Sequence, residues 1–186
     1  DAGLAISAYT LSFRDDFDDV EIDRGFRMAR ALGAPMINAS ATLSVLPRVA
    51  GFARRHEMRV GVHNHAGMAD ENEIETPRSI ERALAVSPWI GLNLDIGHCH
   101  AAGFDPVQLL EAHRARITTL HLKDRQAHDG PNVPFGEGST PLREVLLAMK
   151  RQGARFPANI EYEYRSAQDA TVEIARSLRY CERVLA

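Results

Sequence analysis

The sequence predicts an α/β fold in which parallel strands and covering helices form a TIM-type (β/α)8 barrel. Short apolar, β-rich runs alternate with amphipathic stretches along the whole chain, which is typical of a parallel sheet covered by helices. Polar residues gather at the C-terminal ends of four successive predicted strands, where a barrel places its active site. No Gly-rich dinucleotide fingerprint follows the first predicted strand, which argues against the dinucleotide-binding form of an open, doubly wound sheet.

The composition is that of a soluble globular protein. The 186 residues are 45% hydrophobic and 25% charged, and the formal net charge is −3. We therefore expect no nucleic-acid binding through bulk electrostatics, and no apolar run reaches the roughly 18 residues of a membrane span. Two cysteines and the lack of a secretory signal predict a cytoplasmic protein. The missing N-terminal Met predicts a fragment or a processed chain.

The first half of the chain predicts three strands and three helices. The strands are expected at residues 4–9, 36–39 and 59–65, and the helices at residues 19–32, 45–52 and 80–86. In the first helix, Ile22, Phe26 and Ala29 recur at helical spacing. Gly33 then fits the end of that helix.

The second half repeats the same alternation. Strands are expected at residues 90–95, 117–123 and 158–164, and helices from residue 105, at residues 140–153 and at residues 169–185. Asp105 and Pro106 open a helix in the favoured order of cap and proline. The longest irregular stretch, residues 125–139, is rich in Gly and Pro and is expected to be a functional loop.

Four of these strand ends carry residues that can bind a metal ion. They read His63-Asn64-His65, Asp95-x-x-His98, His121-x-Lys123-Asp124 and Glu161-x-Glu163. Side chains two apart on a strand point to the same face, so these groups converge if that face is the barrel lumen. Imidazole nitrogens and carboxylate oxygens together suit a divalent ion such as Mn²⁺, Mg²⁺, Zn²⁺ or Co²⁺.

Each of these side chains also has a plain structural interpretation. A lone His at a strand end is usually a hydrogen-bonded structural residue, and a lone Asp or Glu there is usually solvated. The joint pattern favours the metal site, because burying so many ionisable groups without a metal or a substrate is costly.

The motifs resemble the xylose-isomerase-like barrels, which include sugar phosphate isomerases and epimerases, inosose dehydratases and endonuclease IV. The matching segments, in order, are residues 61–65, 94–98, 101–106, 121–124, 134–138 and 160–164. Each segment is short and weakly specific by itself, but together they cover nearly the whole chain in the expected order.

The resemblance implies a metal set of Glu, Asp, His and Glu from four strands. Asp95, His121 and Glu161 match the last three positions, and His63 stands where the family has its first Glu. We expect these four residues to bind a divalent ion, with Mn²⁺ as the first choice and Mg²⁺, Zn²⁺ or Co²⁺ as alternatives. Because His63 replaces the first glutamate, we do not expect the family's proton shuttle between two glutamates in its standard form.

The implied reaction is a proton transfer next to the carbonyl of a sugar or sugar phosphate, through an enediolate. Glu161 is the best remaining carboxylate for this transfer, and Glu163 is its alternative. Lys123 is expected to hold a substrate oxygen or phosphate. The other residues expected at the substrate, as orienting groups, proton shuttles or part of a covering loop, are His65, His98 and Glu137. For Glu137 a solvated position in a glycine-rich turn is an equal alternative.

Counted backward from Glu161, the six predicted strands correspond to the third to eighth of the barrel. We therefore expect residues 1–186 to form a single, partial barrel domain that lacks the first two strand–helix units, about 60 residues. Either the chain is truncated, with impaired activity as one outcome, or another chain covers the open edges, for example in a homo-oligomer.

Three alternatives to a sugar isomerase or epimerase remain at this point. An inosose-dehydratase-like lyase would use the same residues. An endonuclease IV-like enzyme for abasic DNA would need additional metal ligands, including an Asp-x-His pair that residues 130–134 lack. The replaced Glu and the missing strands also fit a non-catalytic, degenerate barrel.

Overall fold

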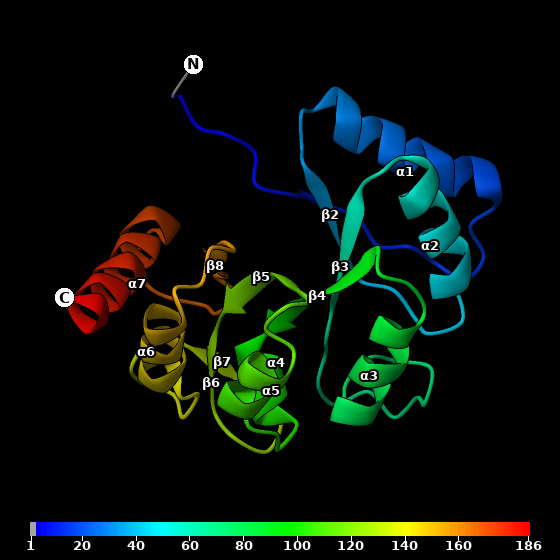
Figure 1. Ribbon diagram of the computed structural model, residues 1–186. Coiled ribbons are helices and arrows are strands. Elements are labelled where there is room, and N and C mark those ends of the chain that lie inside the picture. The colour runs from blue at the N-terminus through cyan, green and yellow to red at the C-terminus, as the bar shows by residue number, and fades with distance from the viewer. Residues whose placement is uncertain (1–2) are drawn as a thin grey trace.

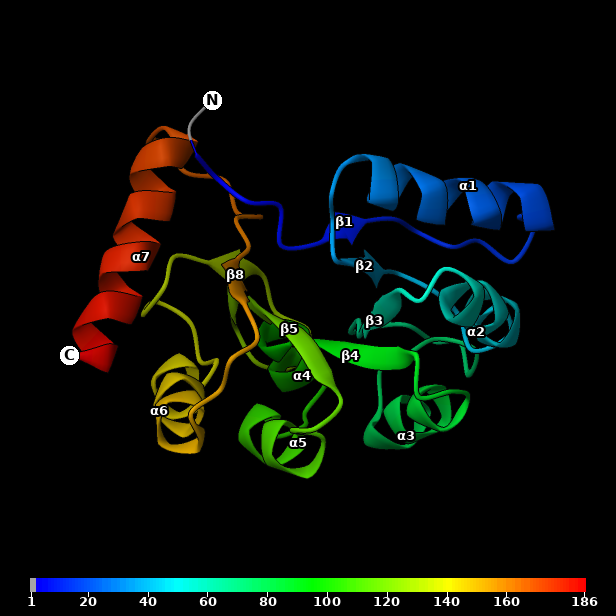
Figure 2. The same cartoon turned by 45° about the horizontal axis from the view of Figure 1, so that its top comes forward.

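The computed structural model describes residues 3–186 and contains one curved sheet of parallel strands. The strand order is β1-β2-β3-β4-β5-β8, and helices lie along the outer side of the curve (Figures 1 and 2). The strands are β1 (Tyr9–Thr10), β2 (Met36–Ala39), β3 (Arg59–His63), β4 (Ile90–Asp95), β5 (Ile117–Leu122) and β8 (Ala158–Ile160). The first and last strands do not pair with each other in this order, so the predicted incomplete (β/α) barrel is confirmed.

The helices are α1 (Asp19–Ala31), α2 (Leu46–Arg55), α3 (Pro77–Ala85), α4 (Ile96–Ala101), α5 (Pro106–Ala112), α6 (Leu142–Gln152) and α7 (Ala170–Leu185). Six of the seven helices overlap a predicted helix, and α1, α6 and α7 begin and end within two residues of the predicted positions. Asp18 caps α1 in a complete capping box with Glu21, and Gly153 ends α6 in the left-handed conformation. Within residues 3–186, none of the helices has both the length and the apolar character of a membrane span.

The first strand is shorter than predicted, and the prediction of residues 4–9 was wrong. Only Tyr9 and Thr10 form β1, paired with Ile37 and Asn38 of β2. Since β2 begins at Met36, the residues before Ala8 have no neighbouring backbone to pair with. Their apolar side chains remain in solvent, and Leu4 is 88% exposed.

Three further differences lie at the C-terminal ends of the strands. The short helix α4 follows β4 without a break, and an antiparallel pair, β6 (Asp124–Arg125) and β7 (Asn132–Val133), lies in and beside the predicted irregular loop. Strands β3 and β8 end at His63 and Ile160, earlier than the predicted residues 65 and 164. The chain leaves the sheet at these points and places side chains above it.

A bulge on β5 helps the sheet to curve. The pairing between β4 and β5 shifts at Leu92, so that Thr118 is an extra residue on β5. Thr118 reaches across β4, and a Cβ atom added at Gly61 of β3 would lie 2.1 Å from its Oγ1 atom. A Cβ at Gly91 of β4 would lie 2.5 Å from its Cγ2 atom. The curvature therefore requires glycine at both positions.

We predict that Gly61→Ala lowers the free energy of unfolding by about 1–3 kcal/mol, the usual cost of forcing extra atoms into a packed interior. Urea denaturation measures this change. Gly51→Ala is the control, because no atom lies within 4 Å of the Cβ that it adds on α2. This control is expected to gain up to about 1 kcal/mol from helix propensity. Equal responses of the two variants would contradict the close approach of β3 and β5.

Candidate metal centre and active site

Four side chains from separate strand ends meet above the C-terminal edge of the sheet. His63 ends β3, Asp95 ends β4, His121 lies near the end of β5, and Glu161 follows β8. One ligand atom from each of the four lies within 4.8 Å of the ligand atoms of the others. We call these four residues the His/carboxylate cluster. Their convergence follows from the parallel sheet, in which all strand ends of one kind lie on the same side.

His121 lies at the centre of the His/carboxylate cluster. Its Nδ1 atom lies 2.7 Å from Glu161 Oε2 and 3.2 Å from His63 Nε2. On the other side of the ring, Nε2 lies 3.1 Å from the side-chain amide nitrogen of Asn93. Thr119 in turn donates a hydrogen bond of 2.6 Å to the amide oxygen of Asn93. This polar chain along the interior of the sheet fixes the imidazole with Nδ1 toward the cluster.

Asp95 is fully buried, and its two carboxylate oxygens have different surroundings. Oδ1 caps α4 by accepting a hydrogen bond of 2.7 Å from the backbone N–H of His98. Oδ2 makes no hydrogen bond among the described residues, and it lies 3.4 Å from His63 Nε2. Burial alone would raise the pKa of Asp95, but the contact with His63 and the charge of Lys123 outweigh it and lower that pKa. Oδ2 is thus an ionised oxygen that faces the cluster without a hydrogen bond, with the Lys123 ammonium 3.2 Å away.

Lys123 extends from the end of β5 to the carboxylates and is 98% buried. Its Nζ atom lies 3.2 Å from Asp95 Oδ2, 3.1 Å from Glu161 Oε2 and 2.9 Å from Glu163 Oε2. Burial opposes the charge, but Asp95 and Glu161 outweigh it, so the pKa of Lys123 is raised. The hydrogen bond from Lys123 lowers the pKa of Glu163. With all three carboxylates ionised, three negative charges and one positive charge leave the group with a net charge of −2.

His65 and His98 lie next to His63 and next to each other, with their own ring centroids 5.9 Å apart. The ring centroid of His65 is 5.0 Å from that of His63, and the centroid of His98 is 5.7 Å from it. Burial is the main cause that lowers the pKa of each of these two imidazoles to about 4. Both rings are therefore neutral near neutral pH, available as donors or acceptors of hydrogen bonds.

These side chains surround a hollow of about 190 Å³. The predicted site residues that line it are His63, His65, His98, His121, Lys123, Glu161 and Glu163. A second hollow of about 420 Å³ adjoins it and shares Ser40 and His65 with it. The charged residues that line this second hollow are Arg14, Asp15, Asp16 and Glu73, and Arg14 pairs with Asp16, so its formal charge is −2.

Glu137 does not join this group. Its Oε1 atom accepts a hydrogen bond of 2.8 Å from Arg176 of α7, and its side chain is 52% exposed. The loop that carries it is held instead by Asp124, whose Oδ2 accepts from the backbone N–H groups of Gly136 and Gly138. Burial raises the pKa of Asp124 against the effect of these bonds. The structure therefore gives the loop an anchor and places Glu137 apart from the hollow.

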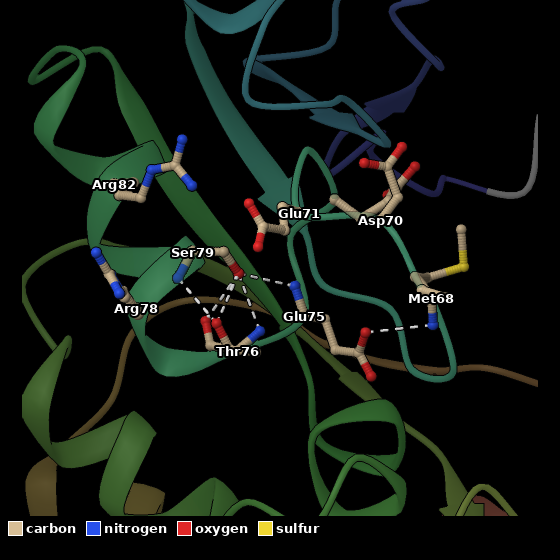
Figure 3. Close-up of a pocket in the computed structure, with 10 residues that line it drawn as sticks. Met68, Asp70, Glu71, Glu75, Thr76, Arg78, Ser79 and Arg82 are labelled. Atoms are coloured by element: carbon tan, nitrogen blue, oxygen red, sulfur yellow. Dashed lines mark hydrogen bonds between the residues drawn. The ribbon is translucent and has the colours of Figure 1, made fainter.

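The loop between β3 and α3 positions His65. The backbone N–H of His65 donates to Ile74 O at 2.9 Å, which closes the loop near its base. Glu75 accepts hydrogen bonds from the backbone N–H groups of Gly67 at 3.0 Å and Met68 at 3.2 Å, the second of which is visible in Figure 3. The pocket of about 350 Å³ in that view lies beside this loop and contains none of the predicted site residues.

Sequence reasoning gave no role to Asn93, Asp124 or Arg125, all of which contact the predicted site or its loops. Asn93 lies in the middle of an apolar strand, so its polar side chain was the only feature of the sequence that could have indicated a role in the site. Asp124 and Arg125 directly follow Lys123, so the sequence alone placed them just after a strand end, near the predicted site. Arg125 donates a hydrogen bond of 2.8 Å to His98 Nδ1, a contact that spacing does not predict.

Comparisons with known proteins agree with this fold. L-ribulose-5-phosphate 3-epimerase UlaE of Escherichia coli is 33% identical over 104 residues, which cover 53% of this chain and 37% of that protein. The matched region thus spans little more than a third of the length of this relative.

Two solved structures share the fold at lower sequence identity. The probable 3-DHS dehydratase AsbF from Bacillus anthracis has a TM-score of 0.79 at 17% identity, over 95% of this chain and 76% of that chain. The 3-keto-D-glucoside 4-epimerase YcjR from Escherichia coli has a TM-score of 0.75 at 15% identity, over 97% and 80% of the two chains. A family model described as a xylose isomerase-like TIM barrel matches residues 3–183, and the chain belongs to this family.

Proposed function

We propose that this protein is a divalent-metal-dependent isomerase or epimerase of a sugar or sugar phosphate, which transfers a proton next to a carbonyl through an enediolate. The His/carboxylate cluster is the observation that carries the proposal, because its four ligand atoms lie within 4.8 Å of one another. UlaE, a relative with 33% identity over about half of this chain, is an epimerase of a ketose phosphate, and its reaction belongs to the proposed class.

The chemistry of the cluster fits a divalent cation. Its two imidazoles and two carboxylates are ligand types that Mn²⁺, Zn²⁺ and Co²⁺ accept. Asp95 Oδ2 is buried and lacks a hydrogen bond among the described residues, and the net charge of −2 on the carboxylates and Lys123 matches a dication. We propose Mn²⁺ first, with Mg²⁺, Zn²⁺ and Co²⁺ as alternatives. A bound divalent ion would polarise a substrate carbonyl and stabilise negative charge on its oxygen.

The side chains around the cluster supply the remaining functions. Glu161 is the proposed proton-transfer group, since its carboxylate faces the hollow, and Glu163 is the alternative carboxylate on the same side. The Lys123 ammonium is proposed to hold a substrate oxygen or phosphate, and the neutral rings of His65 and His98 to orient the substrate. Asp95 and Lys123 are almost fully buried beside the hollow, so their charges interact more strongly with each other than they would in solvent.

A dehydratase would use the same proton transfer, followed by loss of a hydroxide instead of return of the proton. A dehydratase is therefore the second candidate. The observation that favours it is the pair of neutral imidazoles of His65 and His98 beside the cluster, because such a ring can donate a hydrogen bond to a leaving hydroxyl group. Analysis of the product separates the two reactions, because only the dehydratase product lacks one water.

We predict that Asp95→Ala abolishes binding of Mn²⁺ and Zn²⁺, measured by isothermal titration and by the metal content of the purified protein. Asp105→Ala is the matched control, because Asp105 also caps a helix with its carboxylate but lies outside the cluster. Both variants are expected to lose about 0.5–2 kcal/mol of stability with the cap, so only Asp95→Ala should lose the metal. Asp95→Asn keeps a capping oxygen and tests the charge alone. Stoichiometric metal on Asp95→Ala would refute the site.

We further predict that the metal-loaded protein exchanges a carbon-bound hydrogen next to the carbonyl of ketoses or ketose phosphates for deuterium in D₂O. Proton NMR measures this exchange. Glu161→Gln is expected to slow it by about 100-fold or more, the usual contribution of a positioned acid or base. Glu137→Gln is the control, because Glu137 pairs with Arg176 away from the hollow.

Product analysis, a DNA-cleavage assay and metal titration identify the alternative functions. A product that lacks one water would establish the dehydratase, and efficient cleavage of abasic DNA with Zn²⁺ would establish a nuclease. Absence of both metal binding and turnover would show a non-catalytic barrel.

A further inference from the structure

The two adjoining hollows at the C-terminal edge of the sheet contain more negative than positive side chains. The charged residues that line them are five carboxylates, Asp15, Asp16, Glu73, Glu161 and Glu163, and two cations, Arg14 and Lys123. We propose that the substrate is an unphosphorylated ketose, whose hydroxyl-bearing end extends from the His/carboxylate cluster into the second hollow. The choice of a sugar rests on the proposed function, whereas the lack of a phosphate group rests on the charges and hydrogen bonds of the two hollows.

Both cations of the hollows are already paired with carboxylates. Lys123 Nζ has oxygens of Asp95, Glu161 and Glu163 within 3.2 Å. Arg14 Nε donates to Asp16 Oδ1 at 2.8 Å, and Arg14 Nη2 donates to the other oxygen of the same carboxylate. A phosphate ester carries a charge of about −1.5 to −2 near neutral pH. It could bind either cation only by competing with these carboxylates, which would then lie unpaired beside its negative charge.

The second hollow also keeps its negative charge in place. Asp15 Oδ1 accepts hydrogen bonds from Thr42 Oγ1 at 2.7 Å and from Ser44 Oγ at 2.5 Å, which connect the loops before α1 and α2. The bonds from Ser44 and Thr42 lower the pKa of Asp15, so this carboxylate is ionised near neutral pH. Burial, and after it the charges of Asp70 and Asp15, raise the pKa of Glu73. The potential in this hollow is therefore already negative and would repel a phosphate.

The N-termini of the nearby helices, which bind phosphate in many proteins, are closed by the chain itself. Side chains cap α1, α3, α4 and α7, and the capping residues are Asp18, Thr76, Asp95 and Asp169. Three of these four caps are carboxylates, which would repel a phosphate group. At the start of α2, Val45 and Leu46 are buried. Among residues 3–186, the start of each of these five helices is thus capped or covered.

The hollow at the cluster contains neutral groups that can bind a sugar. Asn38 of β2 lines this hollow and is only 3% exposed. One end of its side-chain amide lies 3.1 Å from Thr119 Oγ1, and the other end has no hydrogen bond among the described residues. The Thr119 hydroxyl can meet either end of an amide, so the free end is either the NH₂ group or the carbonyl oxygen. A sugar hydroxyl fits both, because it donates and accepts.

The carboxylates of the second hollow suit the remaining hydroxyl groups of a neutral sugar. Ser40 and His65 line both hollows, so a chain of hydroxyl-bearing carbons can extend from one hollow into the other. An ionised carboxylate accepts hydrogen bonds and donates none, and sugar hydroxyls can supply the donors. Asp15 and Glu73 therefore favour hydroxyl groups and disfavour a phosphate at the same place.

Binding of matched pairs of sugars tests the proposal. L-ribulose, D-fructose and D-tagatose, and the terminal phosphate ester of each, are titrated calorimetrically into the Mn²⁺-loaded protein. The value of kcat/KM for each sugar is measured by hydrogen exchange in D₂O. We expect at least one free ketose to bind and exchange, with an affinity about 10-fold or more above that of its own ester, because like charges in the hollows oppose the ester.

Neutralising the second hollow should reduce this preference. Asp15→Asn combined with Glu73→Gln removes two negative charges and keeps an acceptor oxygen at each position. The affinity for the phosphate ester should rise by about 10-fold or more, and the affinity for the free ketose should not rise. The control combines Glu81→Gln with Glu111→Gln, which removes the same charge from exposed positions on α3 and α5. This control should change neither affinity.

Asn38→Ala tests the neutral contact at the cluster. It should weaken binding of the free ketose by about 5- to 10-fold, the usual effect of one lost hydrogen bond. The metal content of the purified variant should be unchanged, because Asn38 lies outside the His/carboxylate cluster.

The outcomes distinguish the substrate class from the proposed reaction. If the phosphate esters bind as tightly as the free ketoses or more tightly, the substrate is not restricted to unphosphorylated sugars, and the isomerase or epimerase reaction still stands. An unchanged ester affinity in the folded double variant would likewise contradict the role of Asp15 and Glu73. The wild-type comparison remains decisive if the variants do not fold. If metal binds but neither kind of sugar binds or exchanges, the proposed function fails, and the substrate class fails with it.

Discussion

The buried carboxylate of Asp95 connects the fold of this protein to its candidate site. One oxygen caps α4, and the backbone N–H and C=O of the same residue pair with the side-chain amide of Asn64 at 2.8 and 3.0 Å. The other oxygen is left to face His63 and Lys123. An ionised carboxylate that is 0% exposed is stable only with such partners, so the end of β4, the start of α4 and the cluster must form together.

The curved sheet brings the partners of Asp95 to it. Strands β3 and β5 flank β4, and the bulge at Thr118 packs over the glycines of the two neighbouring strands. This close approach lets His63 and His121 meet in front of Asp95 at 3.2 Å from each other. Asn93 and Thr119 continue these polar contacts along the sheet, and the buried apolar side chains form one hydrophobic core. Strand register thus sets the positions of His63, Asp95 and His121, whereas His65 depends on the loop that follows β3.

The fold and the convergence of His63, Asp95, His121 and Glu161 could be predicted from the sequence, because both depend on hydrophobic periodicity and on where the strands end. The sequence did not predict where α4 begins, because Asp95 is both the last residue of β4 and the residue that caps α4. The contact of Arg125 with His98 depends on how the chain turns between β6 and β7, and no spacing rule describes that turn. Glu137 was expected near the substrate from its glycine-rich motif, but the bonds of Asp124 to Gly136 and Gly138 hold the loop so that Glu137 meets Arg176.

The histidine at position 63 changes the electrostatics of the cluster. The family that this chain resembles has a glutamate there, which with the other carboxylates and Lys123 would give a net charge of −3 in place of −2. Under the proposed function, a bound dication would leave a neutral group in this protein and a negative one in the glutamate form. A buried neutral group opposes the growth of negative charge on a substrate oxygen less than a negative group does. In the proposed reaction, a histidine at position 63 would remove one carboxylate that could move a proton, but it would also favour the negative charge that proton abstraction creates. Lys123 lines the same hollow with its ammonium 3.1 Å from Glu161 Oε2, so under the proposed function it would be the cation that holds this negative charge.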